Sequence, residues 1–184
     1  FLAATLAPAA VVRVEVVEEK PVGPYTLVRG KVHFAVDPKL PANRIITDIA
    51  RTQHGLVSRS QALEAGATRH TIQAQLRQGV WTPARDGVYI VGAAEATWRQ
   101  RTMAACLAGG PDVHGSHRTG LRLHGAVDLS GRLEVLTDGY RRVRLPGVFV
   151  HRTIHLLPKD VTIIDGIPVT SLIRSLIDVG GRQS

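Results

Sequence analysis

Hydrogen-bonding side chains recur at helical spacing within residues 68–78. Arg69, Gln73 and Arg77 are four residues apart, so a helix would place them on one face, with His70 beside them. In the major groove of DNA, arginine pairs with guanine and glutamine with adenine through two hydrogen bonds each. The spacing therefore favours contact with base edges. The alternative is the solvated face of an amphipathic helix, which carries similar residues.

Neighbouring residues are suited to phosphate contacts. Ser58 and Thr68 stand where helices are expected to begin, and the backbone N–H groups at such positions bind phosphate. Arg59 adds a charge directly after Ser58. Arg85 lies in a predicted strand turn, from which it could reach the DNA backbone or a minor groove.

The histidines do not form a recognisable metal motif. His114 and His117 are three residues apart, and His151 and His155 are four apart. No glutamate or cysteine completes either pair, and there is no His-Glu-x-x-His sequence. We therefore expect no metal site.

Catalytic motifs are incomplete. Gly115-Ser116 is the nearest approach to Gly-x-Ser-x-Gly and lacks both flanks. The Glu-x-Lys spacing of metal-dependent nucleases occurs at residues 18–20, but no aspartate precedes it. A glycine-rich phosphate loop is also missing. The sequence predicts no enzymatic activity and no cofactor.

Capping residues divide residues 43–79 into three short helices. Each begins at a side chain that can accept from backbone N–H groups and stops at a glycine. The starts are Asn43, Ser58 and Thr68, and the ends are Gly55, Gly66 and Gly79. Two strands around residues 83–87 follow within 81–91. This order is typical of a winged helix-turn-helix, whose second helix of the pair enters the major groove, although any small helical bundle could be capped in this way.

The other segments mix strands and helices. Two strands, 12–16 and 27–36, are expected in residues 1–44, with a turn at Gly23-Pro24 and a break at Gly30. Residues 93–184 should form a small α/β domain with helices at 98–108, 116–124 and 171–179 and strands at 133–137, 148–152 and 161–164. Thr97 and Gln100 should form a capping box before the first of these helices. The predicted class is α+β, with domains 1–44, 45–92 and 93–184.

Composition points towards an anionic partner. The net charge is +8 over 184 residues, which favours nucleic acid over an acidic membrane surface. Basic residues 140–144 could contact phosphate, dock an acidic partner or form a solvated hairpin tip.

A single cysteine excludes an internal disulfide, which favours the cytoplasm. The apolar start FLAATLAPAA resembles part of a signal peptide without its charged region.

About three quarters of the chain, residues 45–180, resembles the AbiEi-like antitoxins of type IV toxin–antitoxin systems. The resemblance is carried by IARTQHGLVSRSQALEAGATRHTIQAQLRQGVW, RDGVYIVG, TWRQRTMAACLAGG, SHRTGLRLHG and DVTIIDGIPVTSLIRSLIDV. It implies a winged helix that represses its own operon, with a reading helix at 68–78 and a wing at 81–91. It also implies an α/β domain acting against a nucleotidyltransferase toxin.

Two features depart from that family. Residues 11–44 are similar to the start of a bacterial α/β-hydrolase-domain family, in the stretch GPYTLVRGKVHFAVDPKLPAN. We expect this segment to be of different origin, joined through a gene fusion, a frameshift or an assembly artefact. Many similar proteins continue into a Vsr-like nuclease domain, and the sequence is expected to stop before one.

Taken together, the residues predict a cytoplasmic, non-catalytic DNA-binding antitoxin or repressor. Its expected partners are its own promoter DNA and a nucleotidyltransferase toxin, with a homodimer or two half-sites giving tight binding. The alternatives are a non-catalytic remnant of a nuclease or hydrolase fusion, and a module that binds only protein.

Overall fold

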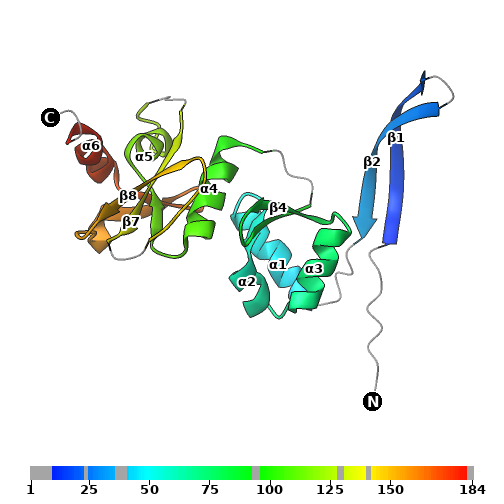
Figure 1. Cartoon of the computed structure of the whole chain (residues 1–184), viewed down its shortest axis with the longest axis horizontal. Coiled ribbons are helices and arrows are strands. Elements are labelled where there is room, and N and C mark those ends of the chain that lie inside the picture. Colours follow the sequence, from blue (N-terminus) through cyan, green and yellow to red (C-terminus); the bar gives the residue numbers. More distant parts are fainter. Residues whose placement is uncertain are drawn as a thin grey trace, which may run out of the picture. The chain divides into compact units, whose positions relative to one another are not determined.

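The computed structural model describes residues 10–22, 25–35, 41–92, 96–127, 131–139 and 142–181 (Figure 1). The chain forms two compact units, residues 1–45 and 46–184. Helices and strands are mixed in the described parts, which confirms the predicted α+β class at that level. Within these residues, no helix combines the length and apolar character needed to cross a membrane.

The first unit contains a long β-hairpin. Strands β1 (Ala10–Val22) and β2 (Tyr25–Ala35) are antiparallel. The predicted break at Gly30 is wrong, because β2 runs through it. Gly30 pairs with Val16 beside a register shift between Val16 and Glu18, and a strand glycine often marks such a bulge. The expected turn at residues 23–24 lies outside the described residues.

The second unit begins with three helices and a small sheet. These elements are α1 (Pro41–Thr52, which starts in the first unit), β3 (Leu56–Ser58), α2 (Arg59–Glu64), α3 (Arg69–Arg77), β4 (Trp81–Arg85) and β5 (Val88–Val91). The sheet order is β3-β5-β4, with antiparallel neighbours. The expected cap at Asn43 is wrong, because α1 already begins at Pro41. Proline suits a first helical turn, where its missing N–H leaves no bond unmade.

A buried cluster holds these elements together. It contains Ile46 of α1, Val57, Ile72 of α3, Trp81 and Tyr89. The rings of Trp81 and Tyr89 are stacked with centroids 5.8 Å apart. Burying Ile72 at the middle of α3 fixes which face of that helix is turned to solvent.

A five-stranded sheet dominates the rest of the second unit. Its elements are α4 (Trp98–Gly109), β6 (Val113–Gly115), α5 (His117–Leu123), β7 (Leu133–Asp138), β8 (Val148–Thr153), the 3-10 helix η1 (Pro158–Asp160), β9 (Val161–Ile164), β10 (Ile167–Thr170) and α6 (Leu172–Gly180). The strand order is β8-β7-β6-β10-β9. Pairs β7–β8 and β6–β10 are parallel, and the others are antiparallel.

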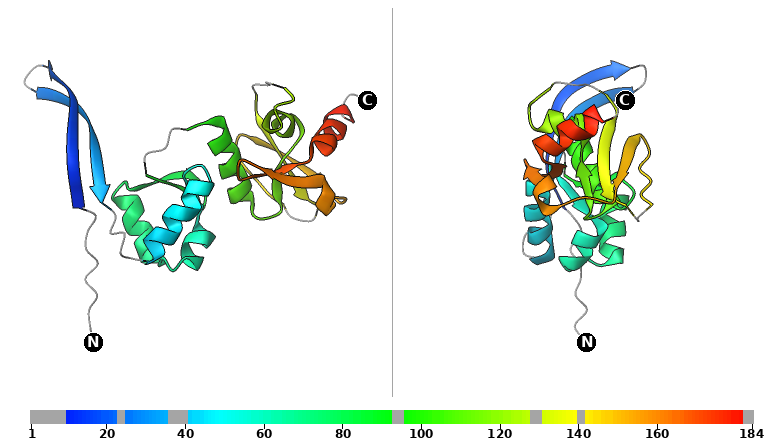
Figure 2. Two further views of the ribbon diagram at one scale, coloured as in Figure 1. Left: turned by 180° about the vertical axis from the view of Figure 1, so that it is seen from behind. Right: turned by 90° about the vertical axis from the view of Figure 1, so that its left-hand side faces the viewer.

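Helix α4 lies between the two sheets of the second unit, as the view from behind shows (Figure 2). One buried cluster contains Leu56 and Val88 of the small sheet together with Met103 of α4 and Ile167 and Val169 of β10. Residues on both sides of the expected 92/93 domain boundary therefore share a core.

A hydrogen bond from Gln100 also joins the two sides of the expected 92/93 domain boundary. Thr97 caps α4 by accepting from the Gln100 N–H, as expected. The Gln100 side chain does not complete the predicted capping box. Its Nε2 instead donates to the His54 carbonyl at 2.8 Å, and Gln100 is buried. Buried polar groups require such partners.

Candidate functional site

The exposed face of α3 brings together four of the predicted DNA-contacting residues. Arg69, His70, Gln73 and Arg77 are exposed, whereas Ile72 is 2% exposed. Thr68 caps the helix, and its Oγ1 accepts from the Thr71 N–H at 3.1 Å. The exposed surface of α3 thus carries two guanidinium groups, an amide and an imidazole, all of which can hydrogen-bond to base edges.

The hydroxyl of Ser58 is already hydrogen-bonded within the protein. Ser58 is 7% exposed, and its Oγ accepts from the Gln61 N–H. Gln61 Oε1 accepts in turn from the Ser58 N–H at 2.9 Å, completing the predicted capping box. Arg59 is exposed at the first position of α2. Of these two neighbours, Arg59 is the one whose side chain is available for a phosphate.

Arg85 is tied to another part of the second unit. It lies at the end of β4, and its Nη1 donates to the Pro146 carbonyl at 3.0 Å. Burial lowers the pKa of this half-buried guanidinium from its ordinary value. The Arg85 guanidinium is therefore hydrogen-bonded to the loop before β8.

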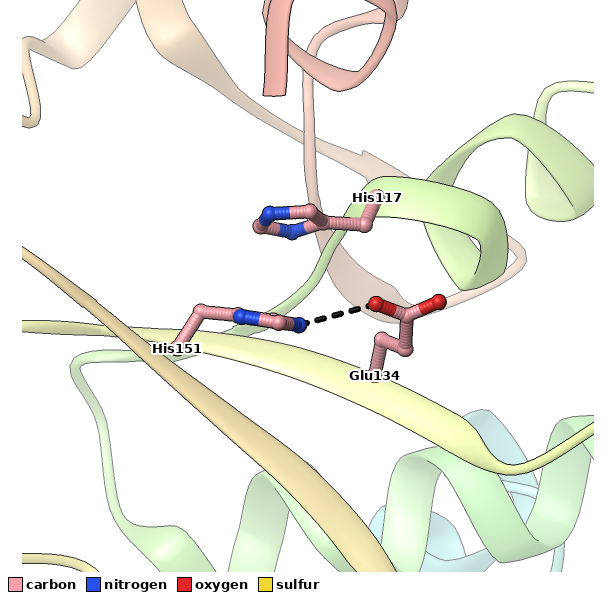
Figure 3. Close-up of side chains that lie close together, drawn as sticks. All are labelled: His117, Glu134 and His151. Carbon is pink, nitrogen blue, oxygen red and sulfur yellow. Dashed lines mark hydrogen bonds and ion pairs between the residues drawn. The ribbon is translucent and has the colours of Figure 1, made fainter. Parts of the chain in front are cut away.

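A second constellation comes from three elements of the five-stranded sheet region. His117, Glu134 and His151 each have a ligand-capable atom, and these atoms lie within 4.8 Å of one another (Figure 3). His151 Nε2 is 2.8 Å from Glu134 Oε2. The two imidazoles are stacked, with centroids 3.7 Å apart and planes inclined by 23°. We call these three residues the His–Glu–His cluster.

Backbone hydrogen bonds fix Glu134 against the start of α5. The Ser116 N–H donates to the Glu134 carbonyl, and the Glu134 N–H donates to Thr119 Oγ1 at 2.8 Å. Parallel pairing of β7 with β8 places Leu136 beside His151. Glu134 and Leu136 share one face of β7, so Glu134 and His151 come together diagonally across the two strands.

His117 has an unusual backbone conformation. Its φ is +51°, although it is neither glycine nor exposed. Non-glycine residues at positive φ are strained, and such strain clusters at functional sites. Its Nδ1 is 3.0 Å from the hydroxyl of the fully buried Ser116. Packing and hydrogen bonding thus hold the imidazole over His151.

The sequence did not indicate this cluster. Spacing along the chain pairs His117 with His114 and His151 with His155, whereas the structure pairs His117 with His151. His114 is half-buried on β6, and burial lowers its pKa. His155 is exposed after β8. Only the register of β7 and β8 and the start of α5 bring the three cluster residues together, and sequence spacing cannot predict that arrangement.

A small basic pocket adjoins Glu134. Arg118, Arg122 and Arg132 line it together with Trp98 and Phe149. The Arg122 guanidinium lies 4.2 Å from the Trp98 ring centroid, and that of Arg132 lies 4.6 Å from the Phe149 centroid. Stacking on aromatic rings orients an arginine while leaving its N–H groups at the ring edge.

No protein-family model matches the chain, and no curated protein matches it either.

Proposed function

We propose that the protein is a sequence-specific DNA-binding repressor that reads operator DNA with α3. The observation that carries the proposal is the element order α1-β3-α2-α3-β4-β5 with sheet order β3-β5-β4. This order supports a winged helix-turn-helix, in which α3 is the reading helix and the β4–β5 hairpin is the wing.

The chemistry of α3 supports the same proposal. Its buried side packs through Ile72, which leaves Arg69, Gln73 and Arg77 facing solvent. These side chains supply the paired donors and acceptors that distinguish bases in the major groove. The net charge of +8 adds attraction to phosphates that does not depend on sequence.

The antitoxin role rests on the resemblance over residues 45–180. In that role, the protein represses its own operon in the cytoplasm and binds a nucleotidyltransferase toxin. A single winged helix contacts few base pairs, so we propose that two copies bind two half-sites. The proposed role needs no enzymatic activity of the chain.

The test is fluorescence-anisotropy binding to the gene's own upstream DNA and to scrambled DNA across a salt series. A specific repressor should prefer the upstream DNA by about a thousandfold or more. Weak binding to both DNAs, falling steeply with salt, would leave only generic charge attraction. That result would contradict specific repression, and the search should then move to a protein partner.

Substitutions on α3 test the assigned face. Arg69→Ala and Arg77→Ala should each weaken specific binding by about 1–3 kcal/mol if the arginines contact bases. Arg101→Ala is the matched control, since Arg101 is an exposed arginine on α4. Unchanged affinity in both α3 variants would remove this face from the interface, even if the protein still bound DNA.

A further inference from the structure

The His–Glu–His cluster is a set of ligands without a role in DNA reading. Its residues belong to α5, β7 and β8, whereas the proposed reading face belongs to α3. Two imidazole nitrogens and one carboxylate oxygen form the donor set that binds zinc and similar first-row dications. We propose that His117, Glu134 and His151 bind a divalent transition-metal ion, with Zn²⁺ as the probe.

The burial of all three cluster side chains is the first argument for a metal-binding site. His117 is 6% exposed, and the side chains of Glu134 and His151 are 8% and 12% exposed. Charged carboxylates are rarely so buried unless they are paired or coordinate a metal. The side chain of His151 retains a small exposed fraction.

The distances are the second argument. The three ligand-capable atoms lie within 4.8 Å of one another, and His151 Nε2 and Glu134 Oε2 are 2.8 Å apart. Bonds from zinc to nitrogen and oxygen are about 2.0–2.2 Å long, so ligands of one ion stand roughly 3–3.5 Å apart. Binding of one ion by all three residues requires the stacked imidazoles to rotate until a ring nitrogen of each points at the ion.

The surroundings of the ligands are the third argument. Metal-binding histidines usually have their other ring nitrogen hydrogen-bonded, which sets the ring orientation. Ser116 Oγ is placed in this way against His117 Nδ1 at 3.0 Å. Both backbone groups of Glu134 are bound to Ser116 and Thr119. The positive φ of His117 shows that the fold maintains a strained backbone at this ligand.

The experiment measures Zn²⁺ binding by the full chain after treatment with a chelator. Isothermal titration calorimetry should give one Zn²⁺ per chain, and the thermal midpoint should rise with Zn²⁺ concentration, because a ligand bound only to the folded state stabilises it. Excess Mg²⁺ should not compete, since Mg²⁺ prefers oxygen ligands in octahedral geometry.

Variants locate the ion. Glu134→Gln and His151→Gln should each weaken Zn²⁺ binding by at least about tenfold, whereas His155→Gln, at an exposed histidine outside the cluster, should bind like the wild type. Circular dichroism checks folding, and if Glu134→Gln unfolds, the His151 variant decides. Absence of saturable Zn²⁺ binding would overturn the proposal, as would equal binding by wild type and His151→Gln.

Discussion

At the scale of single residues, Gly120 shows how closely α5 packs against its neighbours. A Cβ at this position would overlap Ser175 Oγ of α6 and lie 3.2 Å from Thr170 Oγ1. Those two hydroxyls are hydrogen-bonded to each other at 2.7 Å and are fully buried. The absence of a side chain at Gly120 therefore allows α5 and α6 to meet over the end of β10.

Gly120→Ala should lower the free energy of unfolding by about 1–3 kcal/mol, because overpacking a tight contact forces side chains and backbone to shift. Urea denaturation followed by circular dichroism measures the change. Gly180→Ala is the control, since no heavy atom lies within 4 Å of the added Cβ there. Equal stability of the two variants would contradict the tight packing of α5 on α6.

Cys106 illustrates a residue whose chemistry is suppressed by its place. It is the only cysteine of the sequence, and it is 2% exposed in the core shared by the two sheets. Burial raises the pKa of its thiol to about 12. Because the thiolate is the reactive form, this thiol is structural in the folded protein.

At the scale of elements, helix capping was the most accurate guide in the sequence. Ser58, Thr68 and Thr97 cap helices with their side chains as expected, whereas the cap expected at Asn43 is wrong, because α1 already begins at Pro41. Capping is local, so residues three apart in the chain are enough to predict it. Ser116 precedes α5 but forms no side-chain cap, because its hydroxyl contacts the His117 ring and no backbone N–H of the helix.

Thr68→Ala should destabilise the protein by about 1 kcal/mol, because α3 would lose the bond from the Thr71 N–H to Thr68 Oγ1. Thr68→Ser retains a capping hydroxyl and should differ from wild type by only a few tenths of that amount. Chemical denaturation of the three proteins in parallel provides the comparison. An alanine variant as stable as the serine variant would show that α3 is held by Ile72 and its packing alone.

Short strands were the elements that sequence patterns missed. Strands β3 and β6 have three residues each, and β10 carries a proline in four. Such segments are too short to show alternation, and proline argues against a strand. Their pairing depends on partners far along the chain, such as Val169 opposite Gly115. The His–Glu–His cluster was missed for the same reason, since long-range pairing assembles it.

At the scale of the whole molecule, the β-hairpin is a unit separate from the rest. The division into residues 1–45 and 46–184 falls inside α1, just before Ile46, which is the first α1 residue in the buried core. Among its described side chains, Val16 and Val17 are 51% and 69% exposed. A two-stranded hairpin contributes little stability by itself.

Deleting residues 1–40 should therefore leave the second unit folded, with α1 intact from Pro41. We expect the thermal midpoint of the shortened chain to stay within a few degrees, since a change of 1 kcal/mol shifts a domain of this size by about 2–4 °C. Differential scanning calorimetry measures it. Loss of the cooperative transition would show that the hairpin is part of the fold of the second unit.

The core shared by the two sheets has a consequence for genetics. Leu56 and Val88, next to the proposed reading elements, pack with Met103, Ile167 and Val169 in one cluster. Substitutions that disrupt this cluster should destabilise the small sheet together with the α/β part, because both contribute to it. If the protein represses transcription as proposed, a screen for lost repression should recover substitutions at cluster residues such as Met103 and Ile167 as well as on α3. Only the α3 class should leave the amount of protein in the cell unchanged, because the other class acts through unfolding and degradation.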